Sequence, residues 1–239
     1  MSTHAGRTQA LDDAQVDPRT AAGTGSADPT PEQLGIGMRL SIHPHADDFV
    51  DVILGSITDV EQRGLTDGLV VESDAVSTYV GARRAPAEQR LAAYAVALVE
   101  AASRRTGGGH VVAHLLLSRG CPGEVTCDPR SFVEATDPAA PIELEPTGIP
   151  ARAQWSLYPL LDGSSAGGDH MEPIMAAITE AQERGVASEA AHYATMLTGD
   201  LGEVVATATD AWARVGASVP HVVTHLTVSV GSPSEQVAS

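Results

Sequence analysis

Apolar residues follow two spacings along the chain, one typical of strands and one typical of helices. The two spacings succeed one another in the same order in both halves. Apolar side chains recur at every second position in some segments, which indicates strands, and at i, i+3, i+4 spacing in others, which indicates helices. In the first half the expected strands are 38–44, 69–72, 75–81 and 110–118, and the expected helices are 47–63 and 86–105. In the second half the same order is expected at 153–160, 170–184, 186–189, 191–197, 201–217 and 221–230. This β-α-β-β-α-β order is that of the ferredoxin-like split βαβ motif.

The residues themselves also repeat. Residues 110–124 read HVVAHLLLSRGCPGE and residues 221–235 read HVVTHLTVSVGSPSE, so nine of fifteen positions are identical at a constant offset of 111. RLSIHP at 39–44 pairs in the same way with QWSLYP at 154–159, and AVSTYVGA from Ala75 pairs with HYATMLTG from His192. The chain is therefore interpreted as an internal duplication.

Segments poor in large apolar residues separate the two copies. We predict disordered tails at 1–35 and 236–239 and a linker at 125–151, which is rich in Pro, Asp, Glu and Thr. The copies then occupy 36–124 and 152–235. The predicted fold class is α+β, with two tandem ferredoxin-like repeats, each an antiparallel four-stranded sheet with two helices on one face.

Charge and motifs narrow the classes of function. A formal net charge of −17 argues against nucleic acid as a partner, because phosphate backbones repel an acidic surface. No apolar run approaches the roughly 20 residues that a membrane helix needs, and the first residues do not form a leader, so we expect a cytoplasmic protein without membrane insertion. No G-x-S-x-G, Walker, Rossmann or H-E-x-x-H motif occurs, and the two cysteines form no zinc pattern. Neither catalysis nor a metal is expected.

Alternation along the strands indicates which side chains the helices leave uncovered. In strand 110–118 the apolar set Val111, Ala113, Leu115 and Leu117 should face the helices. The alternate set is too polar for a helix-packed surface and should line an open face. The same rule places Ser and His side chains of the other strands on that face, beside small residues that leave room for a ring.

Five segments carry a resemblance to a known family. RLSIHPHADDF, SRGCPGE, WSLYPLLDG, AHYATMLTGD and VTHLTVSVGSPS resemble the signature segments of the YkoF family, over roughly residues 36–235. The resemblance implies ACT-like repeats that bind thiamin or its hydroxymethylpyrimidine precursor (HMP), once per repeat, with no cofactor. It also implies a homodimer and a functional link to a vitamin transporter.

The open face and the resemblance together predict the ligand-binding residues. An aminopyrimidine needs apolar contact with its ring and a few placed polar groups. The candidates in the first half are Ser41, His43, Asp48, Ser77, His114 and Ser118, and those in the second half are Ser156, Tyr158, Asp169, His192, His225 and Ser229. Each half is expected to use its own histidine, and the sites should be unequal because Arg39, His43 and Ala75 correspond to Gln154, Tyr158 and His192.

Other interpretations of these residues remain open. Asp48 and Asp169 precede apolar helical runs, where a carboxylate is commonly an N-cap. His114 and His225 could instead seal an interface between two stacked open faces. A cofactor-independent enzyme with a sheet-face histidine as general base, or an ACT-like regulatory module for a small molecule, would also fit the pattern.

Overall fold

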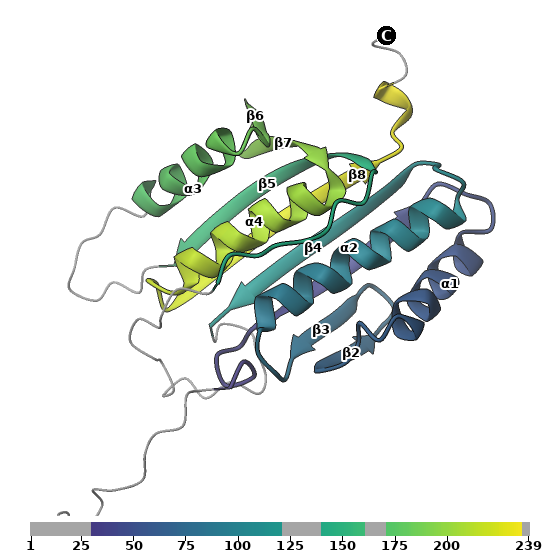
Figure 1. The fold of residues 1–239 in the computed structure, drawn as a ribbon, viewed down its shortest axis with the longest axis horizontal. Coiled ribbons are helices and arrows are strands. Elements are labelled where there is room, and N and C mark those ends of the chain that lie inside the picture. The colour runs from purple at the N-terminus through teal and green to yellow at the C-terminus, as the bar shows by residue number, and fades with distance from the viewer. Residues whose placement is uncertain (1–29, 121–139, 161–170, 236–239) are drawn as a thin grey trace, which may run out of the picture.

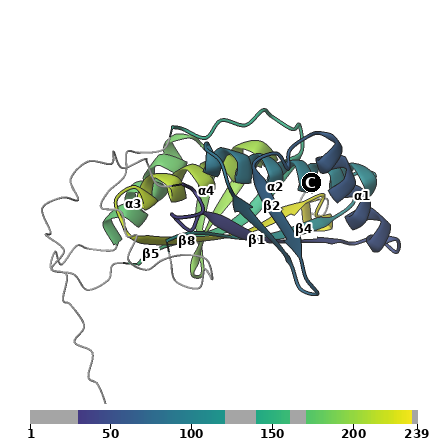
Figure 2. The ribbon, with the colours of Figure 1, turned by 90° about the horizontal axis from the view of Figure 1, so that it is seen from below.

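Eight antiparallel strands form one continuous sheet, and the α-helices all lie on one side of it (Figures 1 and 2). The computed structural model describes residues 30–120, 140–160 and 171–235. Two layers therefore make the molecule, a helical layer over one face of the sheet and an uncovered second face, which we call the open face. The core lies between the two layers.

The predicted order of elements is observed in both halves. In the first half the elements are β1 (Gly37–Pro44), α1 (Phe49–Gln62), β2 (Leu69–Ser73), β3 (Thr78–Ala82), α2 (Ala87–Arg105) and β4 (Val111–Arg119). In the second half they are β5 (Pro150–Leu160), α3 (Met171–Glu183), β6 (Ala187–Ala191), β7 (Ala194–Asp200), α4 (Leu201–Gly216) and β8 (His221–Val230), followed by a short 3₁₀ turn, Pro233–Glu235. The class is α+β with an antiparallel sheet.

The four-stranded sheets predicted for the two halves join edge to edge in one eight-stranded sheet. The strand order is β2-β3-β1-β4-β8-β5-β7-β6, so the halves join where β4 pairs with β8. We call this pairing the seam. Its physical reason is that each strand would otherwise expose a row of unpaired backbone N–H and C=O groups at a sheet edge. The two open faces accordingly lie side by side in one surface and do not stack on each other within the chain.

The alternation predicted along β4 is confirmed by burial. Val111, Ala113, Leu115 and Leu117 are buried, whereas His114 and Leu116 between them are exposed. Strand β8 follows the same rule, with Val222, Leu226 and Val228 buried. The helices therefore cover the face of the sheet that the sequence pattern assigns to them.

The helical layer is continuous across the seam, as the sheet is. Helix α2 packs against α4, and Arg119 at the end of β4 lies beside both. Its Nη1 donates to Oε1 of Glu88 on α2 at 2.9 Å, and both side chains are about nine-tenths buried. On α4, Gly216 leaves the room that Arg119 needs, because a Cβ there would lie 2.6 Å from the arginine Cδ.

Parts of the predicted tail and linker are ordered. Residues 30–35 form a turn in which Leu34 packs against the core and its carbonyl accepts from Gly120 N at 2.9 Å. In the linker, Ile142 is buried, and Glu143 exchanges two hydrogen bonds with the side chain of Gln89 on α2. Apolar side chains at 34, 36 and 142 explain why these stretches pack onto the domain. Strand β5 begins at Pro150, two residues before the expected start of the second copy.

The aspartates that precede helices behave differently. Asp48 occupies the N-cap position of α1, but its side chain makes no capping hydrogen bond, so the interpretation as a cap is wrong for this residue. Asp169 lies outside the described residues. Asp200 does cap α4, accepting from Gly202 N at 2.8 Å, and it also accepts from Thr147 N and Gly148 N of the linker. Burial raises the pKa of Asp200, but these hydrogen bonds outweigh it and leave the pKa below the ordinary value.

Replacing Asp200 with Ala should lower the free energy of unfolding by about 1 to 2 kcal/mol, because it leaves several backbone N–H groups without an acceptor. The stabilisation that the Asp200 carboxylate contributes is fully present above the unfolded-state pKa of this carboxyl. It is lost as pH falls through the lower folded-state pKa. Urea unfolding at pH 7 and at decreasing pH measures both effects.

Asp48→Ala is the matched control, since Asp48 holds the same cap position on α1 without a capping bond. It should change the free energy of unfolding by less than about 0.5 kcal/mol. Equal losses in the two variants would contradict the assignment of Asp200 as the side chain that ties the linker to α4.

Candidate ligand-binding site

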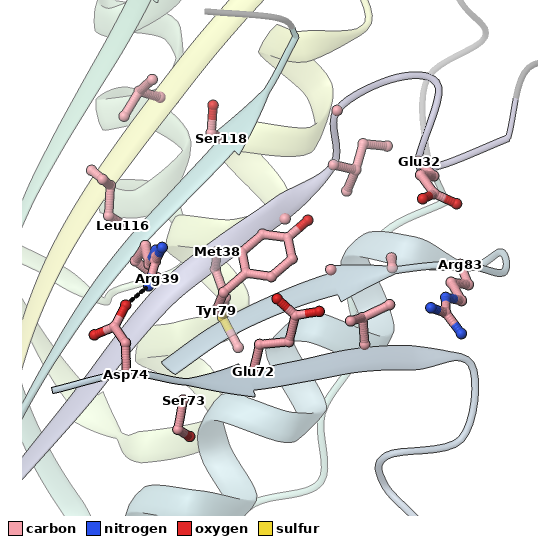
Figure 3. A pocket seen from close by; sticks show the side chains of 17 residues that line it. Glu32, Met38, Arg39, Glu72, Ser73, Asp74, Tyr79, Arg83, Leu116 and Ser118 are labelled. Atoms are coloured by element: carbon pink, nitrogen blue, oxygen red, sulfur yellow. Dashed lines mark hydrogen bonds and ion pairs between the residues drawn. The ribbon is translucent and has the colours of Figure 1, made fainter. Parts of the chain in front are cut away.

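A cavity of about 640 Å³ opens on the open face of the first half (Figure 3). Cross-strand neighbours in two adjacent rows form its floor. One row runs from β2 to β8 and comprises Val70, Gly81, Gly37, Ser118 and Val223. The second row comprises Glu72, Tyr79, Arg39 and Leu116. The volume falls within the range of roughly 300 to 1,000 Å³ that is usual for small-molecule pockets.

The Tyr79 ring lies flat across two glycines. A Cβ on Gly81 would come within 2.5 Å of the tyrosine Oη, and one on Gly37 within 3.2 Å of its Cε2. Both glycines are buried under the ring. Both glycines occupy positions at which a side chain would point to the open face. Because glycine has no side chain, the Tyr79 ring can lie there and form the floor of the cavity.

Arg39 stands beside this ring in a fixed position. It pairs directly with Tyr79 across β1 and β3, and its guanidinium carbon lies 5.9 Å from the ring centroid, which is cation–π distance. Its Nη1 donates to Asp74 Oδ2 at 2.6 Å and to Ser77 Oγ at 3.3 Å. The hairpin between β2 and β3 therefore holds the guanidinium next to the ring.

Asp74 is held as firmly as the arginine that it binds. Its Oδ1 accepts from the backbone N–H groups of Val76 at 2.8 Å and Ser77 at 3.0 Å. The N–H groups of Ser77 and Val76, and then the Arg39 guanidinium, lower the pKa of the Asp74 carboxyl to about 2. The carboxylate is thus ionised at any pH at which the protein would be used.

Glu72 lies on the other side of Tyr79 from Arg39 (Figure 3). Its carboxylate is exposed, and among the residues that the structure describes no hydrogen bond or ion pair occupies it. Glu32 and Arg83 also line the cavity, which gives three carboxylates against two guanidinium groups. The site therefore offers an aromatic surface with a small excess of negative charge.

A cluster of histidine rings crosses the centre of the open face. The rings of His43 and His114 meet edge to face with centroids 5.4 Å apart, and those of His114 and His225 are stacked at 6.2 Å. A further pair, His45 and His110, has centroids 4.4 Å apart. Strands β1, β4 and β8 carry His43, His114 and His225, so the cluster spans the seam. His45 directly follows β1 and His110 directly precedes β4.

Neighbouring hydroxyl groups orient some of these rings. His43 Nε2 is hydrogen-bonded to Ser41 Oγ at 3.0 Å, and His114 Nδ1 to Thr227 Oγ1 at 3.1 Å. Burial lowers the pKa of His43, and the nearby His114 and His45 rings lower it further. Burial and His45 lower the pKa of His110 in the same way. The His43 and His110 rings are therefore biased toward neutral imidazole.

The sequence-predicted residues divide into three groups. Ser118 lines the cavity, and Ser77 holds Arg39 at its edge. The central open face carries Ser41, His43, His114, Ser156, Tyr158, His225 and Ser229. The structure does not bring Asp48 or His192 to the cavity: Asp48 follows the far end of β1, about 23 Å along the strand from Gly37, and His192 is exposed at the β6–β7 turn.

Sequence reasoning missed the residues that build the cavity. Arg39 was expected only as a position at which the two sites differ, and Tyr79 and Glu72 were not among the candidate residues. Two signals could have found them. Gly37 and Gly81 both interrupt strands at positions that face outward, which marks close packing over the backbone. Glu72 needs the pairing register of β2 with β3 as well, which the sequence does not supply.

Comparison with known proteins gives two findings. Residues 150–235 match the YKOF-related Family. The chain is also 28% identical over 202 residues to the "Putative HMP/thiamine-binding protein YkoF" of Bacillus subtilis (strain 168), which covers 84% of this chain and 92% of that protein. The predicted resemblance to the YkoF family is confirmed. The likeness to the YkoF protein extends across both halves and the seam between them.

No group of three or more His, Cys, Asp or Glu side chains in residues 30–120, 140–160 and 171–235 is arranged to hold a metal ion. Within the same ranges, every helix is too short or too polar to cross a bilayer.

The second half has a smaller cavity that overlaps the corresponding place only in part, since Met196, the counterpart of Tyr79, does not line it. Its volume is about 470 Å³, and it lies between the start of β5 and the end of β7. Arg152 and Thr198 line it where the first half has Gly37 and Gly81, and Met196 corresponds to Tyr79. Without the two glycines and the aromatic ring, this cavity differs in shape and chemistry from the first.

Replacing Arg39 with Gln should raise the pKa of Asp74 only part of the way from about 2 toward its ordinary 3.8, because the N–H groups of Ser77 and Val76 contribute more than the guanidinium. An NMR titration of the Asp74 carboxyl carbon in both proteins makes the measurement. A complete return to the ordinary value in the variant would show that the backbone bonds do not hold this carboxylate.

Proposed function

We propose that this protein binds thiamin or HMP without transforming it, and that the first-half cavity is the main site. The observation that carries the proposal is the Tyr79 ring lying on Gly37 and Gly81, with a guanidinium on one side and a carboxylate on the other. The name of the Bacillus subtilis relative, which describes HMP and thiamine binding, supports the choice of ligand.

The chemistry of the ligand suits these groups. An aminopyrimidine ring stacks on Tyr79, since an aromatic face offers it apolar contact and an offset stacking surface. Glu72 accepts from the exocyclic amino group, and the N–H groups of Arg39 that Asp74 and Ser77 do not use can donate to a ring nitrogen. The excess of carboxylates over guanidinium groups favours the positively charged thiazolium of thiamin.

We infer further that each half is one ferredoxin-like repeat, occupying 36–124 and 152–235, with one site in each. Supporting this, strand order and register match between the halves: Ser41 pairs with His114 as Ser156 pairs with His225. The second site would be the weaker one, because Met196, Arg152 and Thr198 replace the aromatic floor.

The proposed biological role is vitamin uptake or salvage, with a functional link to a transporter, as the family resemblance implies. A homodimer is part of the same proposal. Exposed apolar side chains on the open face support it, because Leu116, Tyr158 and Leu160 are 42 to 50% exposed there. Non-catalytic binding is consistent with the absence of a catalytic motif from the sequence.

Replacing Tyr79 with Leu should weaken thiamin and HMP binding by about tenfold or more, because leucine keeps apolar bulk but supplies no stacking surface. Isothermal titration calorimetry of the full chain measures the change. Val76→Ala is the control: Val76 lies on the same hairpin, is 85% exposed and lies outside the cavity. Unchanged binding in Tyr79→Leu, or no binding of either compound by the unaltered chain, would contradict the proposal.

A further inference from the structure

We propose that the first-half site is completed across the seam by His225 of the second half, and that His114 of the first half correspondingly faces the second-half site. This inference rests on the proposed function and deepens it. It reverses the expectation that each half uses its own histidine.

The pairing register places His225 in line with the cavity. Across the sheet Tyr79 pairs with Arg39, Arg39 with Leu116, and Leu116 with His225. Directly opposed residues in an antiparallel sheet point to the same face, so these four side chains form one row on the open face. His225 is the next member of the row after the cavity residue Leu116.

The cavity already crosses the seam. Val223 lines it, although Val223 belongs to β8 in the second half. His225 is two residues farther along the same strand and therefore lies on the same face as Val223. A ligand that fills the cavity as far as β8 thus reaches the strand that carries His225.

His225 and its counterpart in the other half, His114, also differ in their hydrogen bonds. In the equivalent row of the second half, Gln154 pairs with Thr227 and Thr227 with His114, whose Nδ1 is bonded to the threonine hydroxyl. In the row of the first half, which contains Tyr79 and Arg39, Leu116 occupies the position that corresponds to Thr227. Among the residues described, no hydrogen bond involves the His225 ring, which only stacks on His114.

Strand spacing then distinguishes two ligands. From Arg39 to His225 is two strand spacings, about 10 Å, and from Tyr79 it is three, about 14 Å. A single pyrimidine ring on Tyr79 does not cover that span. Thiamin does, because a methylene joins its pyrimidine to a thiazolium that carries a hydroxyethyl arm, and this hydroxyl can hydrogen-bond to the His225 imidazole. His225 is accordingly the residue that distinguishes thiamin from HMP at this site.

Calorimetric titration of the full chain with thiamin and with HMP at pH 7.5 tests the assignment. The site that Tyr79→Leu weakens defines the first-half site. At that site His225→Ala should weaken thiamin by about tenfold, the effect of one lost hydrogen bond, and HMP by less than about twofold. His114→Ala is the matched control and should leave thiamin at that site within about twofold.

Three results would overturn the inference: a weaker Tyr79 site in His114→Ala but not in His225→Ala, equal effects of the two changes, or no effect of His225→Ala. Absence of thiamin binding in the unaltered chain would instead contradict the proposed function itself. If His225→Ala proves unfolded in a thermal melt, Leu116→Thr replaces it. The new hydroxyl would bond to His225 as the Thr227 hydroxyl bonds to His114. The change should therefore weaken the binding of thiamin severalfold more than the binding of HMP, and equal effects would contradict the inference.

Discussion

Nine residues of β4 pair with nine residues of β8, and this antiparallel pairing sets the arrangement of everything else in the fold. Each of these strands would be the edge of a four-stranded sheet if its half stood alone. Pairing satisfies the backbone groups of both edges and aligns the two halves in one plane. It also brings α2 and α4 together on the covered side, where Arg119 and Glu88 form a buried ion pair between the layers.

The same pairing leaves a wide sheet face without helices, and the candidate ligand-binding side chains lie on that face. All the helices pack on the other side, so alternation gives every strand one apolar and one solvent-facing set of side chains (Figure 2). The solvent-facing set includes the tyrosine, arginine, glutamate and histidines of the site. The sheet holds them at fixed spacing. Gly37 and Gly81 leave the space in which the Tyr79 ring lies against the backbone.

The two halves have the same strand order and register but different side chains at several positions. Ser41 and Ser156 keep the same relation to their histidines, whereas Tyr79 and Arg39 correspond to Met196 and Gln154. Asp74 and Ser77, which hold Arg39, correspond to alanines in the second half. Buried positions differ as well, since Leu40 corresponds to Trp155, but the exchanges around the cavity change the groups that a ligand would meet.

The sequence by itself determined the elements, their order, the repeat and the side of each strand that faces solvent, because these depend on local period and on identity between the halves. It did not determine that β4 and β8 pair, since either edge would satisfy the same alternation. The cavity also depended on tertiary structure: Arg39 is far in the chain from Glu72 and Tyr79, and only strand register places the three in one row. His114 and His225 were recognised from sequence, but only the pairing of β4 with β8 brings their rings together.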